Sequence, residues 1–251
     1  MIETSNAFKK LKMQIQDSMD ILLLCCHAIP ALKAYSKAVK GGTAPKLPDP
    51  DYFSIPSPID RLEKISPKYR KTLGKLVFLN SFSYFEAYIT EITNEFLEFH
   101  GMGNEFSKRE DEIKKAILDN KFEPIARKLR EPIKKGKEAK YKKIKAELIN
   151  NGYYFPKELI STYGVKRIQK QLEELRAAQI PNLLKDIFEL ELSEVEIKEF
   201  HEMRTFRNNI AHGKVKEVDL GQAIKNNEFL RNLAIKIDKH ILKYFFVADV
   251  S

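Results

Sequence analysis

The stretch RNNIAHG, residues 207–213, brings Arg207, Asn208 and His212 close together in the sequence. An arginine guanidinium is a planar fork of donors that can neutralise a phosphate and the extra negative charge that develops on it during reaction. A histidine titrates near neutral pH, so it can accept a proton from a ribose 2′-hydroxyl or donate one to a departing 5′-oxygen. These residue types suit cleavage of an RNA phosphodiester without a metal ion.

A second interpretation of the same residues is structural. Cations near the C-terminal end of a helix interact favourably with the helix dipole and donate hydrogen bonds to its last carbonyl oxygens. Arginine and histidine are both common on protein surfaces. The spacing of Arg207 and His212 therefore favours this second interpretation when it is considered alone.

The motif must be positioned by a helix, which we expect to begin at Ser193 and to stop at Gly213. Ser193 followed by Glu196 has the form of a capping box, and glycine is a frequent stop residue. At about 100° per residue, one polar face of this helix carries Arg207, Arg204, Asn208, His201 and His212. The other side carries Met203, Phe206 and Ile210, an apolar stripe that we expect to dock the helix. We expect a surface role for His201.

The rest of the chain predicts further helices. Lys, Glu, Leu, Ile and Ala are abundant, whereas the chain has 10 glycines and no tryptophan, a composition that favours helix over sheet. Apolar residues recur at helical spacing in residues 3–40, 67–100, 165–178, 181–190 and 218–246. Prolines and glycines interrupt residues 41–58, which we expect to form an irregular connection. The predicted fold class is all-α.

The predicted helix over residues 67–100 supplies a candidate partner for the motif. Glu86 stands in a strongly apolar part of this helix, and a carboxylate that is buried is usually paired. Arg204 or Arg207 is a natural partner, and such a pair would tune or position the site. An exposed Glu86 without a partner is the alternative that the sequence leaves open.

Residues 108–157 have a different character, because seven lysines face one glutamate in KKGKEAKYKKIK at 134–145. Such a run is typical of a solvated face. Tyr141 and the aromatic residues at 153–155 leave a nucleic-acid contact open, because aromatic rings stack on unpaired bases. On that interpretation the RNA-binding residues are Lys134, Lys135, Lys137, Lys140, Lys142 and Lys143.

Composition limits the remaining classes of function. The chain has 44 Lys and Arg against 35 Asp and Glu, a net charge of +9 that is compatible with an anionic partner without specifying one. Cys25 and Cys26 are adjacent, so neither a CxxC metal site nor a disulfide framework is expected. Motifs for serine hydrolases and for nucleotide binding are not found, and we expect no cofactor and no metal. We find no signal-peptide pattern and no apolar run of about 18 residues, so we expect a cytoplasmic protein with no membrane partner.

The stretch RNNIAHG resembles the R-N-x-x-x-H form of the Rx4-6H signature of HEPN domains. LNSFSYFEAYITEI at 79–92 is similar to an early HEPN helix that packs against the motif helix, and the RiboL-PSP-like and MAE-type branches are the most similar. The resemblance implies an up-and-down helical bundle that dimerises, so that two Arg/His faces form one composite ribonuclease site. On this resemblance Arg207 would hold the scissile phosphate, His212 would act as general acid or base, and Asn208 would orient the histidine or the substrate. The implied products are a 2′,3′-cyclic phosphate and a 5′-hydroxyl.

We therefore predict a single HEPN-like domain over 1–251, made of an N-terminal helix and proline-rich connector (1–66), a core helix (67–107), a basic insertion (108–157) and core helices with the motif (158–251). The predicted function is a metal-independent endoribonuclease of phage defence or toxin–antitoxin biology. Its expected partners are RNA (tRNA or mRNA), a second copy of the chain, and an antitoxin or defence protein. Two alternatives are a non-catalytic HEPN module that binds RNA or nucleotide or builds a dimer, and a structural adaptor.

Overall fold

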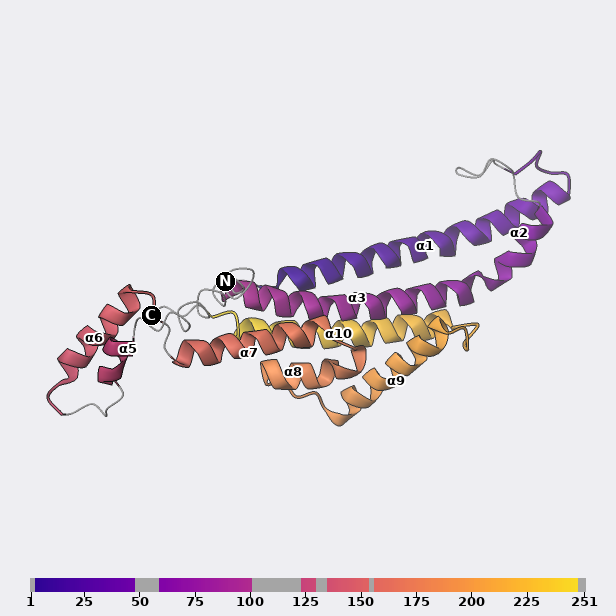
Figure 1. Ribbon diagram of the computed structural model, residues 1–251. Coiled ribbons are helices and arrows are strands. Elements are labelled where there is room, and N and C mark those ends of the chain that lie inside the picture. The colour runs from indigo at the N-terminus through magenta and orange to yellow at the C-terminus, as the bar shows by residue number, and fades with distance from the viewer. Residues whose placement is uncertain (1–2, 48–58, 101–122, 130–134, 154–155, 248–251) are drawn as a thin grey trace. The chain divides into compact units, whose positions relative to one another are not determined.

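The computed structural model describes residues 3–47, 59–100, 123–129, 135–153 and 156–247 (Figure 1). Every regular element in these ranges is a helix, which confirms the predicted all-α class. The chain packs as two compact units, one formed by Met1–Glu95 with Arg176–Ser251 and the other by Phe96–Leu175. The single-domain organisation stays a prediction.

The first unit contains two long helices that run side by side in opposite directions, α1 (Asn6–Lys40) and α3 (Tyr69–Phe99) (Figure 1). Ser5 caps α1 by accepting the backbone N–H of Phe8 at 3.0 Å, and its hydroxyl donates to buried Asp238. Glu95 of α3 accepts the backbone N–H of Ala7 at 2.9 Å. The N-terminal end of α1 is thus fixed by side chains that are distant in sequence.

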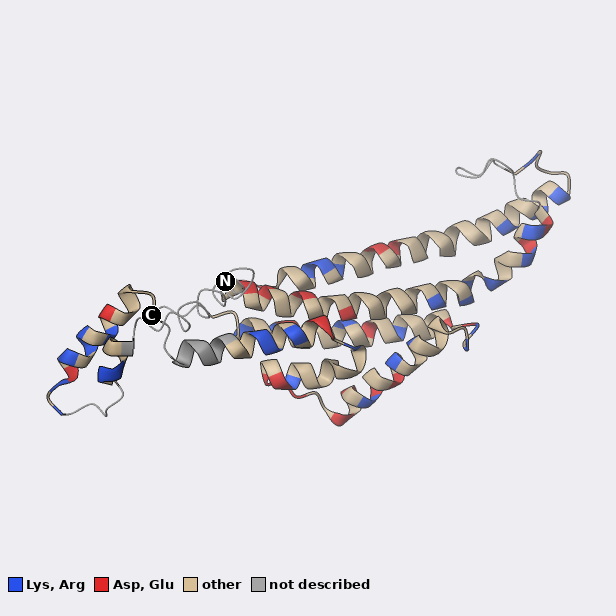
Figure 2. Ribbon diagram, in the orientation of Figure 1, with Lys and Arg blue, Asp and Glu red and all other residues tan. Residues whose placement is uncertain are grey.

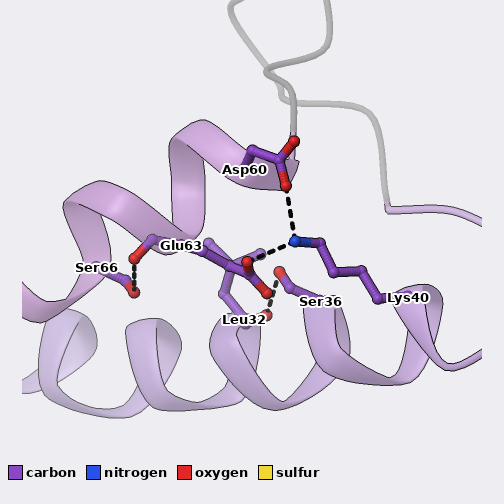
Figure 3. Close-up of polar contacts among 6 residues, drawn as sticks. All are labelled: Leu32, Ser36, Lys40, Asp60, Glu63 and Ser66. Carbon is purple, nitrogen blue, oxygen red and sulfur yellow. Dashed lines mark hydrogen bonds and ion pairs between the residues drawn. The ribbon is translucent and has the colours of Figure 1, made fainter.

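At the other end of α1, a short helix α2 (Ile59–Ile65) and a 3₁₀ turn η1 (Ser66–Lys68) lead into α3. The Lys40 ammonium lies 2.7 Å from the carboxylates of both Asp60 and Glu63, which ties α2 to the last turn of α1 (Figure 3). The prediction included residues 59–66 in the proline-rich connector that follows the N-terminal helix, and it missed α2. Residues 48–58 of the predicted connector lie outside the described residues.

Three further helices complete this unit: α8 (Ile180–Phe188), preceded by the turn η3 (Ala177–Gln179), then α9 (Glu194–Ala211) and α10 (Leu220–Tyr244). Pro181 lies in the first turn of α8, where its missing N–H is not needed. The core gathers around α3, whose fully buried side chains include Phe78, Phe82, Phe85, Tyr88, Ile89 and Ile92. The broad apolar stripe of α3 is thus covered from several sides, as its sequence predicted.

The second unit contains α5 (Glu123–Ala126), η2 (Arg127–Leu129), α6 (Glu138–Asn150) and α7 (Pro156–Glu173). The helix predicted at 165–178 therefore begins and ends earlier than expected. Lys135 and Lys137 precede α6, which carries Lys140, Lys142 and Lys143, and all five side chains are exposed. Lys134 lies outside the described residues.

One feature of α1 differs from the expectation. Among the described helices, α1 has the length and composition that could cross a membrane, although the sequence was expected to contain no such segment. Ile21, Leu23 and Leu24 on α1 are exposed, whereas Ala7 and Leu11 are buried in the bundle. Core helices of soluble proteins and signal sequences meet the same criterion, so it is weak grounds for a membrane role.

Candidate functional site

Helix α9 contains Arg207 to Ala211 of the RNNIAHG motif and is followed by His212 and Gly213, and both of its ends follow from local sequence signals. At its start, Ser193 Oγ accepts the backbone N–H of Glu196, and the Glu196 carboxylate accepts the backbone N–H of Ser193 at 2.7 Å. At its end, His212 is the C-cap residue and Gly213 takes a φ of 71°, a left-handed conformation that favours glycine. The predicted capping box and stop residue are confirmed.

Three contacts hold the Arg207 guanidinium, two with residues of α3 and one with the neighbouring Asn208 of α9. One terminal nitrogen of the guanidinium lies 2.9 Å from a Glu86 carboxylate oxygen, and the other donates to Asn208 Oδ1 at 3.1 Å. The guanidinium carbon lies 5.7 Å from the centre of the Phe82 ring. A planar cation that is paired on its edge and stacked on an aromatic face is restricted in position and orientation.

The structure selects Arg207 from the two arginines that the sequence offered as partners of Glu86. The reason is visible in the packing of α9, because Phe200 is fully buried between α3 residues and lies near Arg207 on the helical wheel. Arg207 therefore borders the buried stripe instead of standing opposite it. The expectation that the whole polar face lies away from the apolar one was wrong for this residue.

Partial burial shapes the electrostatics of the pair. The side chains of Arg207 and Glu86 keep 31% and 27% of their exposure. Burial raises the pKa of Glu86 above its ordinary value, and the attraction and hydrogen bond of Arg207 offset only part of this effect. Arg207 remains partly open to solvent, and a guanidinium has five N–H donors, so donors remain for an anionic ligand.

His212 occupies a different environment from Arg207. It follows the last helical residue of α9, its backbone N–H donates to Asn208 O at 2.9 Å, and its side chain is exposed. Five residues of helix turn by about 140° and rise by about 7.5 Å. The two side chains therefore leave α9 in different directions within one chain.

The capping interpretation fits only half of the motif. His212 does stand at the C-cap, where a cation is favourable. By contrast, the Arg207 guanidinium forms an ion pair with Glu86, donates a hydrogen bond to Asn208 and lies over the Phe82 ring. Helix capping therefore does not account for the position of the arginine.

Two other polar side chains of α9 are less exposed than the sequence indicated. His201 was expected at the surface, but it is half-buried, and its Nδ1 atom is buried without a hydrogen-bond partner in the described structure. Arg204 Nε is buried in the same way. Arg204 thus lies on α9 next to the site without joining the Glu86 pair.

A hollow of about 580 Å³ lies elsewhere on α9, facing α10. Met203 and Phe206 of α9 and Gln222 and Asn226 of α10 contribute to its lining, whereas Arg207 and His212 do not. This hollow is therefore separate from Arg207 and His212. Within the described residues, no group of three or more His, Cys, Asp or Glu side chains could hold a metal ion.

The family profile of RiboL-PSP-HEPN matches residues 54–243. The chain belongs to the RiboL-PSP-HEPN family. The matched segment contains Glu86, Arg207, Asn208 and His212, and it leaves α1 outside. Membership of the HEPN superfamily is compatible with a ribonuclease-type or a nucleotide-binding module. Comparisons with curated proteins and with solved structures gave no match.

Sequence reasoning missed Phe82 as part of this RiboL-PSP-HEPN site. Phe82 precedes Glu86 by four residues on α3, so both side chains lie on one helical face. That spacing was available as a signal, but the ring was counted as core because the surrounding segment is so apolar. The five described lysines proposed for RNA binding, Lys135, Lys137, Lys140, Lys142 and Lys143, belong to the unit Phe96–Leu175, whereas Glu86 and Arg207 belong to the other unit.

Proposed function

We propose that this protein is a metal-independent endoribonuclease whose composite site is formed by α9 of two copies of the chain. The observation that carries the proposal is the fixed but partly open guanidinium of Arg207 on the helix that ends in exposed His212. A donor group held in place before the substrate arrives stabilises developing negative charge without reorganising. Arg207 is the proposed phosphate-binding residue, and Glu86 and Asn208 are its positioning residues.

The reaction follows from the chemistry of RNA. One His212 imidazole takes the proton from a ribose 2′-hydroxyl, and the 2′-oxygen then forms a bond to the adjacent phosphorus. The bond from phosphorus to the 5′-oxygen breaks, and a second imidazolium donates its proton to that oxygen. The products are a 2′,3′-cyclic phosphate and a 5′-hydroxyl.

A second copy of the chain supplies what one copy lacks. Arg207 and His212 of one chain project in different directions, so one copy does not readily direct both groups to one phosphate. A symmetric pair of α9 helices would place two arginines and two histidines around a single strand. Size-exclusion chromatography with light scattering tests the dimer, and a protein that stays monomeric at assay concentration contradicts this part of the proposal.

The cleavage test uses purified protein, total RNA and a labelled tRNA pool in EDTA. Arg207→Ala and His212→Ala are compared with His27→Ala, which replaces an exposed histidine of α1. We expect wild type and His27→Ala to cleave and to leave cyclic phosphate ends, and the other two variants to be inactive. Cleavage that needs a divalent metal, or that survives in both motif variants, contradicts the proposal.

A non-catalytic module is the second candidate, because the pairing of Arg207 with Glu86 is also a sound structural contact. A helix face with arginine and asparagine binds phosphate whether or not cleavage follows. The His212→Ala variant separates the two functions, since a chemical histidine is needed for cleavage and dispensable for RNA binding. Wild-type protein that binds RNA and leaves it intact would favour the second candidate.

The biological setting that we propose is phage defence or a toxin–antitoxin pair in the cytoplasm. An active ribonuclease that acts on tRNA or mRNA arrests growth, and an antitoxin or a defence protein would then restrain it. Induced expression in cells tests this role, with growth arrest expected for wild type and normal growth for Arg207→Ala. Normal growth with both proteins contradicts the toxic role.

A further inference from the structure

Lysines from two distant parts of the chain meet beside the C-terminal end of α9. The Lys71 ammonium of α3 pairs with the Glu217 carboxylate in the loop between α9 and α10. Gly74 of α3 lies so close to Val218 that a Cβ atom at position 74 would overlap the Val218 carbonyl oxygen. The loop is therefore pressed against the first turns of α3.

This contact assembles a basic patch, which we define as Lys68, Lys71, Lys75, Lys214 and Lys216. Lys68 and Lys75 act on Glu217 together with Lys71, because the lysines lower the pKa of its carboxyl group. Among the described residues, Lys68, Lys75, Lys214 and Lys216 form no ion pair. Figure 2 shows Lys and Arg residues along the first part of α3 and in the loop after α9. Three lysines thus act on one glutamate, and exposed Lys214 and Lys216, which precede Glu217 in the loop, add further positive charge.

The loop joins the patch to the motif. Lys214 follows His212 by two residues, and the backbone N–H groups of Lys214 and Val215 both donate to Asn209 O, at 2.9 and 3.2 Å. These bonds fix the start of the loop on the last turn of α9. Lys214 is therefore held close to His212 by the fold as well as by the sequence.

Helix α3 joins the patch to the arginine. Lys75 and Glu86 are eleven residues apart on α3, a spacing that returns to nearly the same face of an α-helix. Lys75 lies about 16 Å from Glu86 along the axis at 1.5 Å per residue. Lys71 and Lys75 therefore lie on the same helix as Glu86, on the N-terminal side of the Glu86–Arg207 pair.

We infer that this basic patch binds the sugar–phosphate backbone of the RNA strand beside the scissile phosphate. The inference rests on the proposed function for the identity of the scissile phosphate. Lysine ammonium groups are point charges on flexible stems, so they contact phosphates without reading bases. The patch positions the strand and strengthens binding, and it takes no part in the chemical step.

The test replaces three lysines of the patch that make no ion pair, in the triple variant Lys75→Gln, Lys214→Gln and Lys216→Gln. Lys71 is kept because it holds the loop through Glu217. The matched control replaces three exposed lysines of α1, in the triple variant Lys9→Gln, Lys12→Gln and Lys33→Gln. Both triple variants lose the same charge, so a difference between them reports position. Circular dichroism verifies that both keep the helical content of wild type.

Binding is measured with a labelled single-stranded RNA by fluorescence anisotropy over a salt series, in proteins that also carry His212→Ala to prevent cleavage. If three phosphate contacts to a single strand are lost, the slope of the logarithm of the association constant against the logarithm of the salt concentration becomes shallower by about 2. We expect this change in the patch variant and a smaller one in the control. Equal slopes in patch variant and control, or no change from wild type in either, overturn the inference.

A kinetic arm separates this inference from the proposed ribonuclease activity. With His212 restored, the patch variant is expected to cleave a dinucleotide at the wild-type rate and long RNA with a raised KM. If wild type cleaves nothing, the proposed function fails, and the anisotropy series still decides whether the patch binds RNA. If the patch variant loses dinucleotide cleavage as well, the patch acts on the chemical step and the inference is overturned.

Discussion

Replacing Gly74 with alanine tests how α3 holds the loop that follows the motif. A Cβ atom at this buried position would overlap the Val218 carbonyl oxygen and stand 3.1 Å from the Val218 carbonyl carbon and 3.2 Å from that of Asp219. All three are backbone atoms, so no side chain can rotate away to relieve the overlap. The loop must lift from α3, or the two helices that it connects must shift.

The expected magnitude combines two opposing effects. Alanine in place of glycine favours a helix by about 1 kcal/mol, whereas one extra carbon in a tight contact costs about 1–3 kcal/mol. Because the overlap is with fixed backbone, the cost lies in the upper part of that range. We expect Gly74→Ala to lower the free energy of unfolding by about 1–2 kcal/mol.

Urea unfolding followed by circular dichroism measures the stability, and hydrogen exchange of peptides that contain residues 213–219 measures the loop. The control is Gly164→Ala in α7, a helical glycine whose added Cβ would meet nothing within 4 Å. That variant is expected to match or exceed wild-type stability. Unchanged stability and unchanged exchange of the loop in Gly74→Ala would refute the packing argument.

Two other predictions concern Glu86, which is partly buried, and the buried pair of Ser5 and Asp238. Burial raises the pKa of Glu86, so the native state keeps the carboxyl proton of Glu86 to a higher pH than the unfolded chain does. The free energy of unfolding is therefore expected to fall as pH rises from the ordinary carboxyl range through the raised pKa. In Glu86→Gln the free energy of unfolding, measured by urea titration between about pH 4 and 7, is expected to depend less on pH than in wild type. The same pH dependence in both proteins contradicts the raised pKa of Glu86. Ser5→Ala removes the cap of α1 and leaves Asp238 without its hydroxyl donor, so we expect a loss of about 1–3 kcal/mol and faster hydrogen exchange in the first turn of α1. Exposed Ser83→Ala on α3 is the control, and an equal effect of both serine variants contradicts the role of the cap.

Local signals explain which parts of the fold could be predicted. The ends of α9 depend on Ser193, Glu196 and Gly213, whose preferences act within a few residues of the chain, and all three behave as expected. Helix α2 was missed because the prolines before it dominate the local pattern, while its contact with Lys40 comes from another helix. A contact between two segments that are distant in sequence cannot be predicted from the local preferences of either segment.

The candidate site shows the same division between local and distant information. The residue types of the site could be predicted from the sequence. Arg204 and Arg207, however, are three residues apart on one helix, and only the packing of α9 on α3 determines that Arg207 pairs with Glu86. The lysine run at 134–145 was considered for RNA binding because its lysines are contiguous in the sequence. The patch around Lys71 and Lys216 is assembled from segments about 140 residues apart, and neither segment is unusual when it is considered by itself.

The structure gives Arg207 and His212 separate supports, and this separation can be used to assign their roles. Arg207 depends on Glu86 and Phe82 of α3, whereas His212 depends on the turn at Gly213 and on the loop that Gly74 allows to pack. Glu86→Gln should therefore loosen the arginine and leave the histidine in place, and Gly74→Ala should do the reverse. If Arg207 binds phosphate and His212 transfers protons, the first variant weakens RNA binding, and the second lowers the cleavage rate while RNA still binds. Identical defects in the two variants would contradict this division of roles between the arginine and the histidine.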